Sequence, residues 1–111
     1  MNAVSMTLPL DAIAEYCRRW KITELALFGS AIRDDFGPQS DIDLLATFAP
    51  DATWGLLDGV QMVDEIEKLL GRKVDLINRR ALERSANIAR RDAILSSAHV
   101  IYRAPEALYV A

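Results

Sequence analysis

Aspartates and a Gly-Ser pair mark the part of this sequence that could carry out chemistry. Gly29 and Ser30 follow one apolar run, and Asp41 and Asp43 stand at the head of another, "DIDLLATF". Because side chains alternate along a strand, Asp41 and Asp43 would share one face. Together with a third carboxylate such as Asp75 in "KVDLIN", they would repel each other unless a cation neutralised them, and Mg²⁺ prefers oxygen ligands of this kind. These residues predict a Mg²⁺ site that a phosphate-bearing substrate would share.

The Gly-Ser pair could supply the phosphate-binding half of such a site. Gly29 would let the backbone approach a ligand closely, and Ser30 offers a hydroxyl beside backbone amides at the start of a short helical turn. Ten residues separate Ser30 from Asp41. A loop of that length could bring both groups to one edge of a sheet, where we expect phosphate and metal to meet.

The pattern "GS", ten residues, then "DID" resembles the GS-x10-D-x-D signature of the nucleotidyltransferase superfamily that includes DNA polymerase beta. With "KVDLI" and the small size, the chain is similar to the minimal nucleotidyltransferases over nearly its whole length. The resemblance implies that Gly29 and Ser30 bind the β- and γ-phosphates of ATP. It also implies that Asp41, Asp43 and Asp75 are the catalytic residues and the ligands of two Mg²⁺ ions.

The same resemblance implies a reaction and a partner. Minimal nucleotidyltransferases commonly act as antitoxins beside HEPN-family ribonuclease toxins, by moving AMP from ATP to a toxin tyrosine. The chain is therefore expected to be a protein adenylyltransferase that forms a hetero-oligomer with its toxin. Two alternatives stay open: a non-catalytic antitoxin that neutralises its toxin by steric binding, and a nucleotidyltransferase for a small molecule such as an aminoglycoside. The short chain counts against the second, because those relatives carry additional substrate-binding structure.

Several other reactive side chains have simpler interpretations. Arg33 is a candidate for contact with nucleotide phosphate, with a solvated position as the alternative. His99 opens an apolar strand without a paired acid or nucleophile, so we expect a structural or surface role. Cys17 falls in a helical apolar pattern and should be core. Tyr102 and Tyr109 could be modified, but core packing and an ordinary tail position suit them better.

Composition predicts one soluble domain over residues 1–111. Apolar residues make up 51% of the chain and charged residues 26%, which is normal for a globular protein. The net charge of −3 disfavours direct nucleic-acid binding. No signal-like or membrane-spanning apolar run is present, so we expect no membrane association and a cytoplasmic location. The arginines among residues 79–91 are interpreted as a solvated helix face.

Periodicity predicts the order helix, strand, strand, helix, strand, helix, strand. A helix should end near Trp20, and a helix from Leu56, with Val60 on its apolar stripe, should cover the sheet and end at Gly71. A further helix is expected from about Leu82 to Ala98. Strands are predicted at 24–29, 41–48, 73–78 and 99–103. The fold class is α/β (α+β), a small mixed sheet flanked by helices; the resemblance implies the DNA polymerase beta-like nucleotidyltransferase fold.

Overall fold

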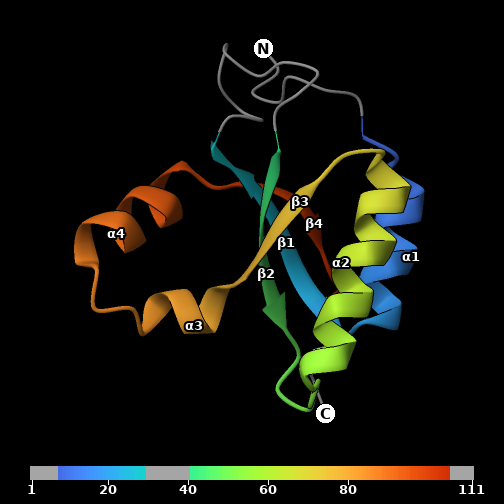
Figure 1. Ribbon diagram of the computed structural model, residues 1–111, viewed down its shortest axis with the longest axis horizontal. Coiled ribbons are helices and arrows are strands. Elements are labelled where there is room, and N and C mark those ends of the chain that lie inside the picture. Colours follow the sequence, from blue (N-terminus) through green and yellow to red (C-terminus); the bar gives the residue numbers. More distant parts are fainter. Residues whose placement is uncertain (1–7, 30–40, 106–111) are drawn as a thin grey trace.

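The computed structural model of the protein describes residues 8–29 and 41–105 (Figure 1). Four strands form one sheet in the order β3-β2-β1-β4. Strand β1 pairs with β2 and with β4 in antiparallel fashion, whereas β2 and β3 are parallel. The predicted mixed sheet is therefore confirmed. The elements are α1 (Leu10–Arg19), β1 (Ile22–Phe28), β2 (Ile42–Phe48), α2 (Leu56–Leu70), β3 (Val74–Asn78), α3 (Arg79–Glu83), α4 (Ile88–Ser97) and β4 (His99–Arg103).

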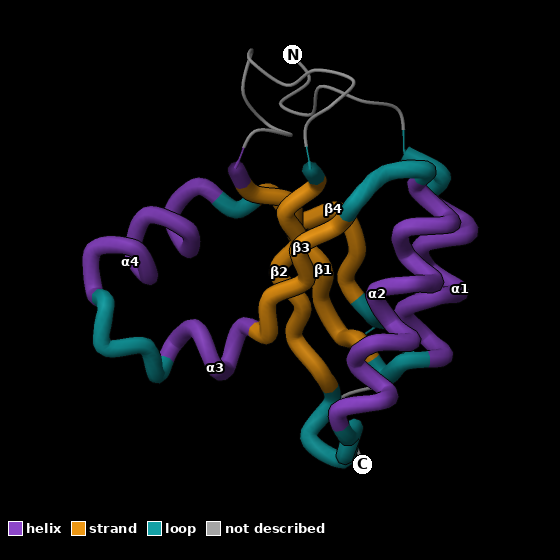
Figure 2. Tube along the Cα trace, viewed as in Figure 1, coloured by secondary structure: helices purple, strands orange, loops and turns teal. Residues whose placement is uncertain are grey.

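Helices lie on both faces of the sheet (Figure 2). Helices α1 and α2 pack on one face, and the main core lies beneath them. The opposite face carries a smaller cluster to which α3 contributes Leu82 and α4 contributes Ile94. The central strands β1 and β2 are consequently apolar on both faces, which explains their nearly unbroken burial.

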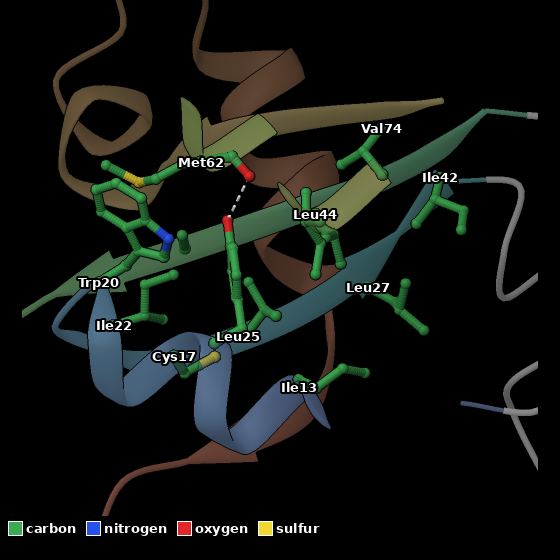
Figure 3. Packing of buried hydrophobic residues seen from close by; sticks show 13 residues of the cluster. Ile13, Cys17, Trp20, Ile22, Leu25, Leu27, Ile42, Leu44, Met62 and Val74 are labelled. Carbon is green, nitrogen blue, oxygen red and sulfur yellow. Dashed lines mark hydrogen bonds between the residues drawn. The ribbon is translucent and has the colours of Figure 1, made fainter. Parts of the chain in front are cut away.

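A buried hydrogen bond joins the two helices of the main core. The hydroxyl of Tyr16 in α1 donates to the backbone carbonyl of Met62 in α2 at 2.9 Å, within the packed cluster drawn in Figure 3. Burial raises the pKa of this phenol well above its usual range, so it stays a donor. Cys17, on the same helix, is fully buried, as predicted.

Helix α2 ends where the sequence predicts. Gly71 adopts a left-handed conformation with φ of 70°, and its N–H donates to the carbonyl of Glu67 at 2.8 Å. The chain then enters β3, and this β-α-β crossover gives β2 and β3 their parallel pairing. None of the helices within 8–29 and 41–105 has the length and apolar character needed to span a membrane.

The prediction of a single helix from about Leu82 to Ala98 is wrong, because α3 ends within this region and α4 begins within it. Helix α3 begins at once after β3, where the Asn78 side chain accepts a hydrogen bond from the N–H of Arg80 at 2.9 Å. It ends at Glu83, and Asn87 starts α4 by accepting from the N–H of Arg90 at 3.1 Å. The cap at Asn87 therefore begins a second helix inside the segment that was expected to be one.

The start of α2 also departs from its predicted role. Met62 and Ile66 are buried against the sheet, but Leu56 and Val60 are exposed. Only the later part of the helical stripe reaches the core.

Candidate functional site

Three of the predicted site residues, Gly29, Asp43 and Asp75, lie at one end of the sheet. Phe28, the last residue of β1, is paired with Asp43 of β2, and Asp43 is in turn paired with Asp75 of β3. Paired residues on neighbouring strands point to the same face. The carboxylates of Asp43 and Asp75 are thus lateral neighbours, although a helix separates them in sequence.

Gly29 lies directly against the first of these carboxylates. Its φ is 71°, and a Cβ on this residue would overlap Oδ2 of Asp43 and lie 3.2 Å from its Cγ. A glycine is required here for two reasons: the left-handed backbone and the space that the aspartate occupies. The absence of a side chain at position 29 is therefore part of how Asp43 is placed.

Asp41 lies one residue before β2, and its side chain is exposed. The neighbouring Ile42 anchors the start of this strand, because its N–H donates to the carbonyl of Lys73 at 2.9 Å. The backbone therefore holds Asp41 at the same end of the sheet as Asp43. Ser30 and Arg33, the other predicted nucleotide-binding residues, lie outside the described residues.

The site opens toward the face of the sheet that α3 and α4 cover. Asp43 lies on the same face of β2 as Leu45, two residues along, and Asp75 lies on the same face of β3 as Ile77. Leu45 and Ile77 both pack in the cluster with Leu82 of α3 and Ile94 of α4. The carboxylates of Asp43 and Asp75 thus lie at the end of the sheet, on the face that α3 and α4 cover.

The donor set suits a hard cation. Asp43 and Asp75 offer carboxylate oxygens side by side, and Gly29 leaves the Asp43 carboxylate room to lie where it does. Within the part of the chain that the structure describes, no three Asp, Glu, His or Cys side chains gather closely enough to hold a metal ion. The pair fits Mg²⁺, which takes most of its remaining ligands from water and phosphate, and the three-carboxylate site stays a prediction.

The remaining candidates take the positions of ordinary structural residues. His99 is exposed at the start of β4 and is paired with Leu27, whose side chain belongs to the opposite face from Asp43. Arg79 forms ion pairs with Glu24 and Glu83 at 3.1 and 3.2 Å. Tyr102 packs against the main core, and Tyr109 lies outside the described residues.

A groove that the sequence did not predict lies at the far end of the sheet. This groove of about 930 Å³ runs between α2, the ends of β2 and β3, and the start of α3. Trp54, Leu56 and Val60 belong to its lining. The signal in the sequence was the apolar stripe of the helix, which was interpreted wholly as core.

Comparisons with known proteins identify the family of this chain. A family model described as "Nucleotidyltransferase domain" matches residues 10–100. The protein adenylyltransferase MntA of Thermococcus cleftensis is 32% identical over 69 residues, which cover 62% of this chain and 68% of that protein. A Methanocaldococcus jannaschii protein, provisionally named as a protein adenylyltransferase, is 33% identical over 64 residues; the match covers 58% of this chain and 64% of that protein's length.

Solved structures share the fold. A toxin-antitoxin crystal structure with AMP-PNP has a TM-score of 0.67 at 20% identity, with 93% of this chain and 82% of that chain covered. The complex of a tri-AMPylated Shewanella oneidensis HEPN toxin with its MNT antitoxin has a TM-score of 0.58 at 20% identity, with 91% of this chain and 77% of that chain covered. The family match spans most of the chain and includes Gly29, Asp41, Asp43 and Asp75. The chain belongs to the nucleotidyltransferase domain family.

Proposed function

We propose that this chain is a Mg²⁺-dependent protein adenylyltransferase that transfers AMP from ATP to a tyrosine hydroxyl of a HEPN-family toxin and so acts as an antitoxin. The observation that carries the proposal is the register that sets Asp43 beside Asp75 and next to Gly29. Two relatives named for protein adenylyltransferase activity and a neighbour described as a complex with an AMPylated HEPN toxin support it.

Each residue has a role in this reaction. Gly29 and Ser30 would hold the β- and γ-phosphates, and Arg33 would add a cation near them. Asp41, Asp43 and Asp75 would hold the Mg²⁺ ions. When bound, these ions supply a Lewis acid for the phosphates and for the acceptor hydroxyl. Asp75 would also accept the proton from that hydroxyl.

The step balances without a further reactant. The tyrosine oxygen forms a bond to the α-phosphorus of ATP, and the bond from that phosphorus to the bridging oxygen of the β-phosphate breaks. Pyrophosphate leaves, and the hydroxyl proton passes to Asp75 and then to solvent. The chain's part is to orient the nucleotide and to keep negative charge where a metal and a proton are needed.

Intact-mass measurement tests the proposal. The chain is mixed with Mg-ATP and the purified HEPN partner, and the toxin should gain the mass of one AMP residue per transfer. The Asp41→Asn/Asp43→Asn variant should produce no adduct, and EDTA should abolish the transfer. Asp51→Asn is the matched control, because Asp51 pairs with Lys21 away from the site at 3.1 Å and its loss should leave the transfer rate at saturating toxin unchanged.

Two results would contradict the enzyme assignment. One is an unmodified toxin that is nevertheless fully inhibited by the Asp41→Asn/Asp43→Asn variant, which would identify a steric antitoxin. The other is pyrophosphate release that depends on an aminoglycoside and needs no toxin.

A further inference from the structure

The first two turns of α2 expose an unusual amount of apolar surface. Leu56 is 85% exposed, Leu57 82% and Val60 62%, and the neighbouring Trp54 is 37% exposed. These side chains lie in the first turns of one helix and just before it rather than scattered over the molecule, which is the arrangement associated with interaction sites. The apolar residues of α2 thus extend toward its N-terminus, beyond the part of the helix that is buried in the core.

This apolar surface borders the groove at the far end of the sheet. Phe48, Val63 and Leu76 continue its apolar lining inward, and Asp64, Glu67 and Arg80 are the charged residues that line it. A groove with an apolar floor and a few charged groups is suited to apolar side chains presented by another protein. We define the α2 docking surface as this groove with Trp54, Leu56, Leu57 and Val60.

The docking surface is separate from the nucleotide site. Asp43 lies near the start of β2, whereas Phe48 is its last residue. At about 3.3 Å per residue, the two are roughly 16 Å apart along the strand. A protein bound at the docking surface would leave the edge with Gly29, Asp43 and Asp75 open.

Charge identifies the kind of partner. Residues 49–67 contain five carboxylates and no Lys or Arg. Lys21, Arg19 and Lys68 pair with three of them, but no ion pair within the described parts of the chain involves Asp58 or Glu67. Arg80 is the basic residue in the groove lining, so these two carboxylates leave the docking surface with an acidic excess of one charge. A second copy placed on the same surface would bring like charges together, whereas a partner with Lys or Arg beside its apolar residues would complement them.

We infer that the α2 docking surface binds the HEPN-family toxin through apolar side chains flanked by basic residues on the toxin. The identity of the partner rests on the proposed function. The inference adds where the toxin is held: at a surface remote from the catalytic edge, so that holding the toxin and modifying it are separable.

Two substitutions at one exposed position test this. Val60→Glu and Val60→Lys both remove the apolar contact, and neither disturbs the core because the side chain lies outside it. Titration of the purified HEPN partner should give an affinity about tenfold weaker for Val60→Glu, as expected for one lost aliphatic contact. Val60→Lys should weaken binding further, and added salt should weaken wild-type binding.

Transfer kinetics give the second readout. Both variants should raise the toxin concentration needed for half-maximal transfer and leave the saturated rate unchanged, while the Asp41→Asn/Asp43→Asn variant should bind toxin like wild type.

Toxin binding that is unaltered by both Val60 variants would overturn the inference, even if AMP transfer is intact. So would sedimentation showing that the chain alone dimerises and that Val60→Lys abolishes the dimer. Tight binding that Val60→Lys disrupts, with no AMP adduct at all, would uphold the docking surface and contradict only the adenylyltransferase assignment.

Discussion

At the scale of single residues, two glycines share a backbone conformation and differ in their surroundings. Gly29 has φ of 71° and Gly71 has φ of 70°. A Cβ at Gly71 would meet nothing within 4 Å, whereas one at Gly29 would overlap the Asp43 carboxylate. Substituting each glycine in turn therefore distinguishes two effects: the strain of a left-handed backbone, which both positions have, and the displacement of Asp43, which only position 29 would cause.

Gly29→Ala should reduce AMP transfer about 100-fold, the size of effect expected when a reacting group is displaced by roughly 1 Å. Gly71→Ala should leave transfer unchanged. Each should also lower the free energy of unfolding by about 1–2 kcal/mol because of left-handed strain. Transfer assays with both variants, alongside urea denaturation, check this; equal loss of transfer in both would show that strain alone is responsible.

Glu65 gives the fold a pH dependence at the residue scale. Its carboxylate accepts a hydrogen bond from the indole N–H of Trp20 at 2.6 Å and from Arg19 at 2.9 Å. The Trp20 bond first, and then Arg19, lower the pKa of Glu65. A depressed pKa in the folded state contributes stability above the unfolded value, near pH 4.3, and this stability is lost as the pH falls through the folded value.

Glu65→Gln should therefore lower the free energy of unfolding by about 1 kcal/mol at pH 7, because a charge-assisted bond is replaced by a neutral one. The difference from wild type should disappear below the folded pKa of Glu65. Urea denaturation followed by tryptophan fluorescence at a series of pH values measures it. A deficit that persists at the acid end would contradict the ionic explanation.

At the scale of elements, α3 and α4 are separated by a side-chain cap. Asn87 accepts from the N–H of Arg90 at 3.1 Å, and its own N–H donates to the hydroxyl oxygen of Ser85 at 3.2 Å. The turn between the helices is fixed by these local bonds. Helix α4 also supplies Ile94 to the cluster on the face of the sheet that carries Asp43 and Asp75, so this helix packs on the same face as the candidate site.

Asn87→Ala should lower the free energy of unfolding by about 1 kcal/mol through loss of the cap. Asn87→Asp keeps an acceptor oxygen at the helix N-terminus and should retain wild-type stability. Thermal denaturation by circular dichroism compares the three proteins. If the aspartate variant is as unstable as the alanine variant, the cap is not the reason that α4 begins there.

Sequence patterns predicted most of these elements because apolar spacing and a terminating glycine report directly on local structure. The division of α3 from α4 was missed because the arginine-rich segment offers little apolar contrast to mark a break. The exposure of Leu56 and Val60 was missed for another reason: periodicity identifies the face of a helix but not whether anything covers it. The pairing of Asp43 with Asp75 depends on strand register, which only the folded sheet determines.

At the scale of the whole molecule, Cys17 reports on global opening. The thiol is fully buried among residues of the main core, and burial raises its pKa to about 12. A buried protonated thiol is a poor nucleophile. It becomes reactive only when α1 leaves the sheet, which also breaks the Tyr16–Met62 bond.

Labelling of Cys17 by a disulfide reagent at pH 8 should therefore be slow in the native protein and immediate in concentrated guanidinium. Urea should accelerate it in proportion to the globally unfolded fraction. Tyr16→Phe should raise the native labelling rate about fivefold to tenfold, as expected for a lost buried hydrogen bond of about 1 kcal/mol or slightly more. Rapid labelling without denaturant would show that α1 opens by itself.

The parallel pairing of β2 with β3 determines when, during synthesis, the candidate site can be assembled. During synthesis, Gly29, Asp41 and Asp43 leave the ribosome well before Asp75, and the α2 crossover must form before Asp75 can join them. A growing or truncated chain that lacks β3 would have an incomplete carboxylate set. Under the proposed function, catalytic activity would therefore appear only after the α2 crossover has formed and β3 has paired with β2, rather than increasing gradually as the chain is made.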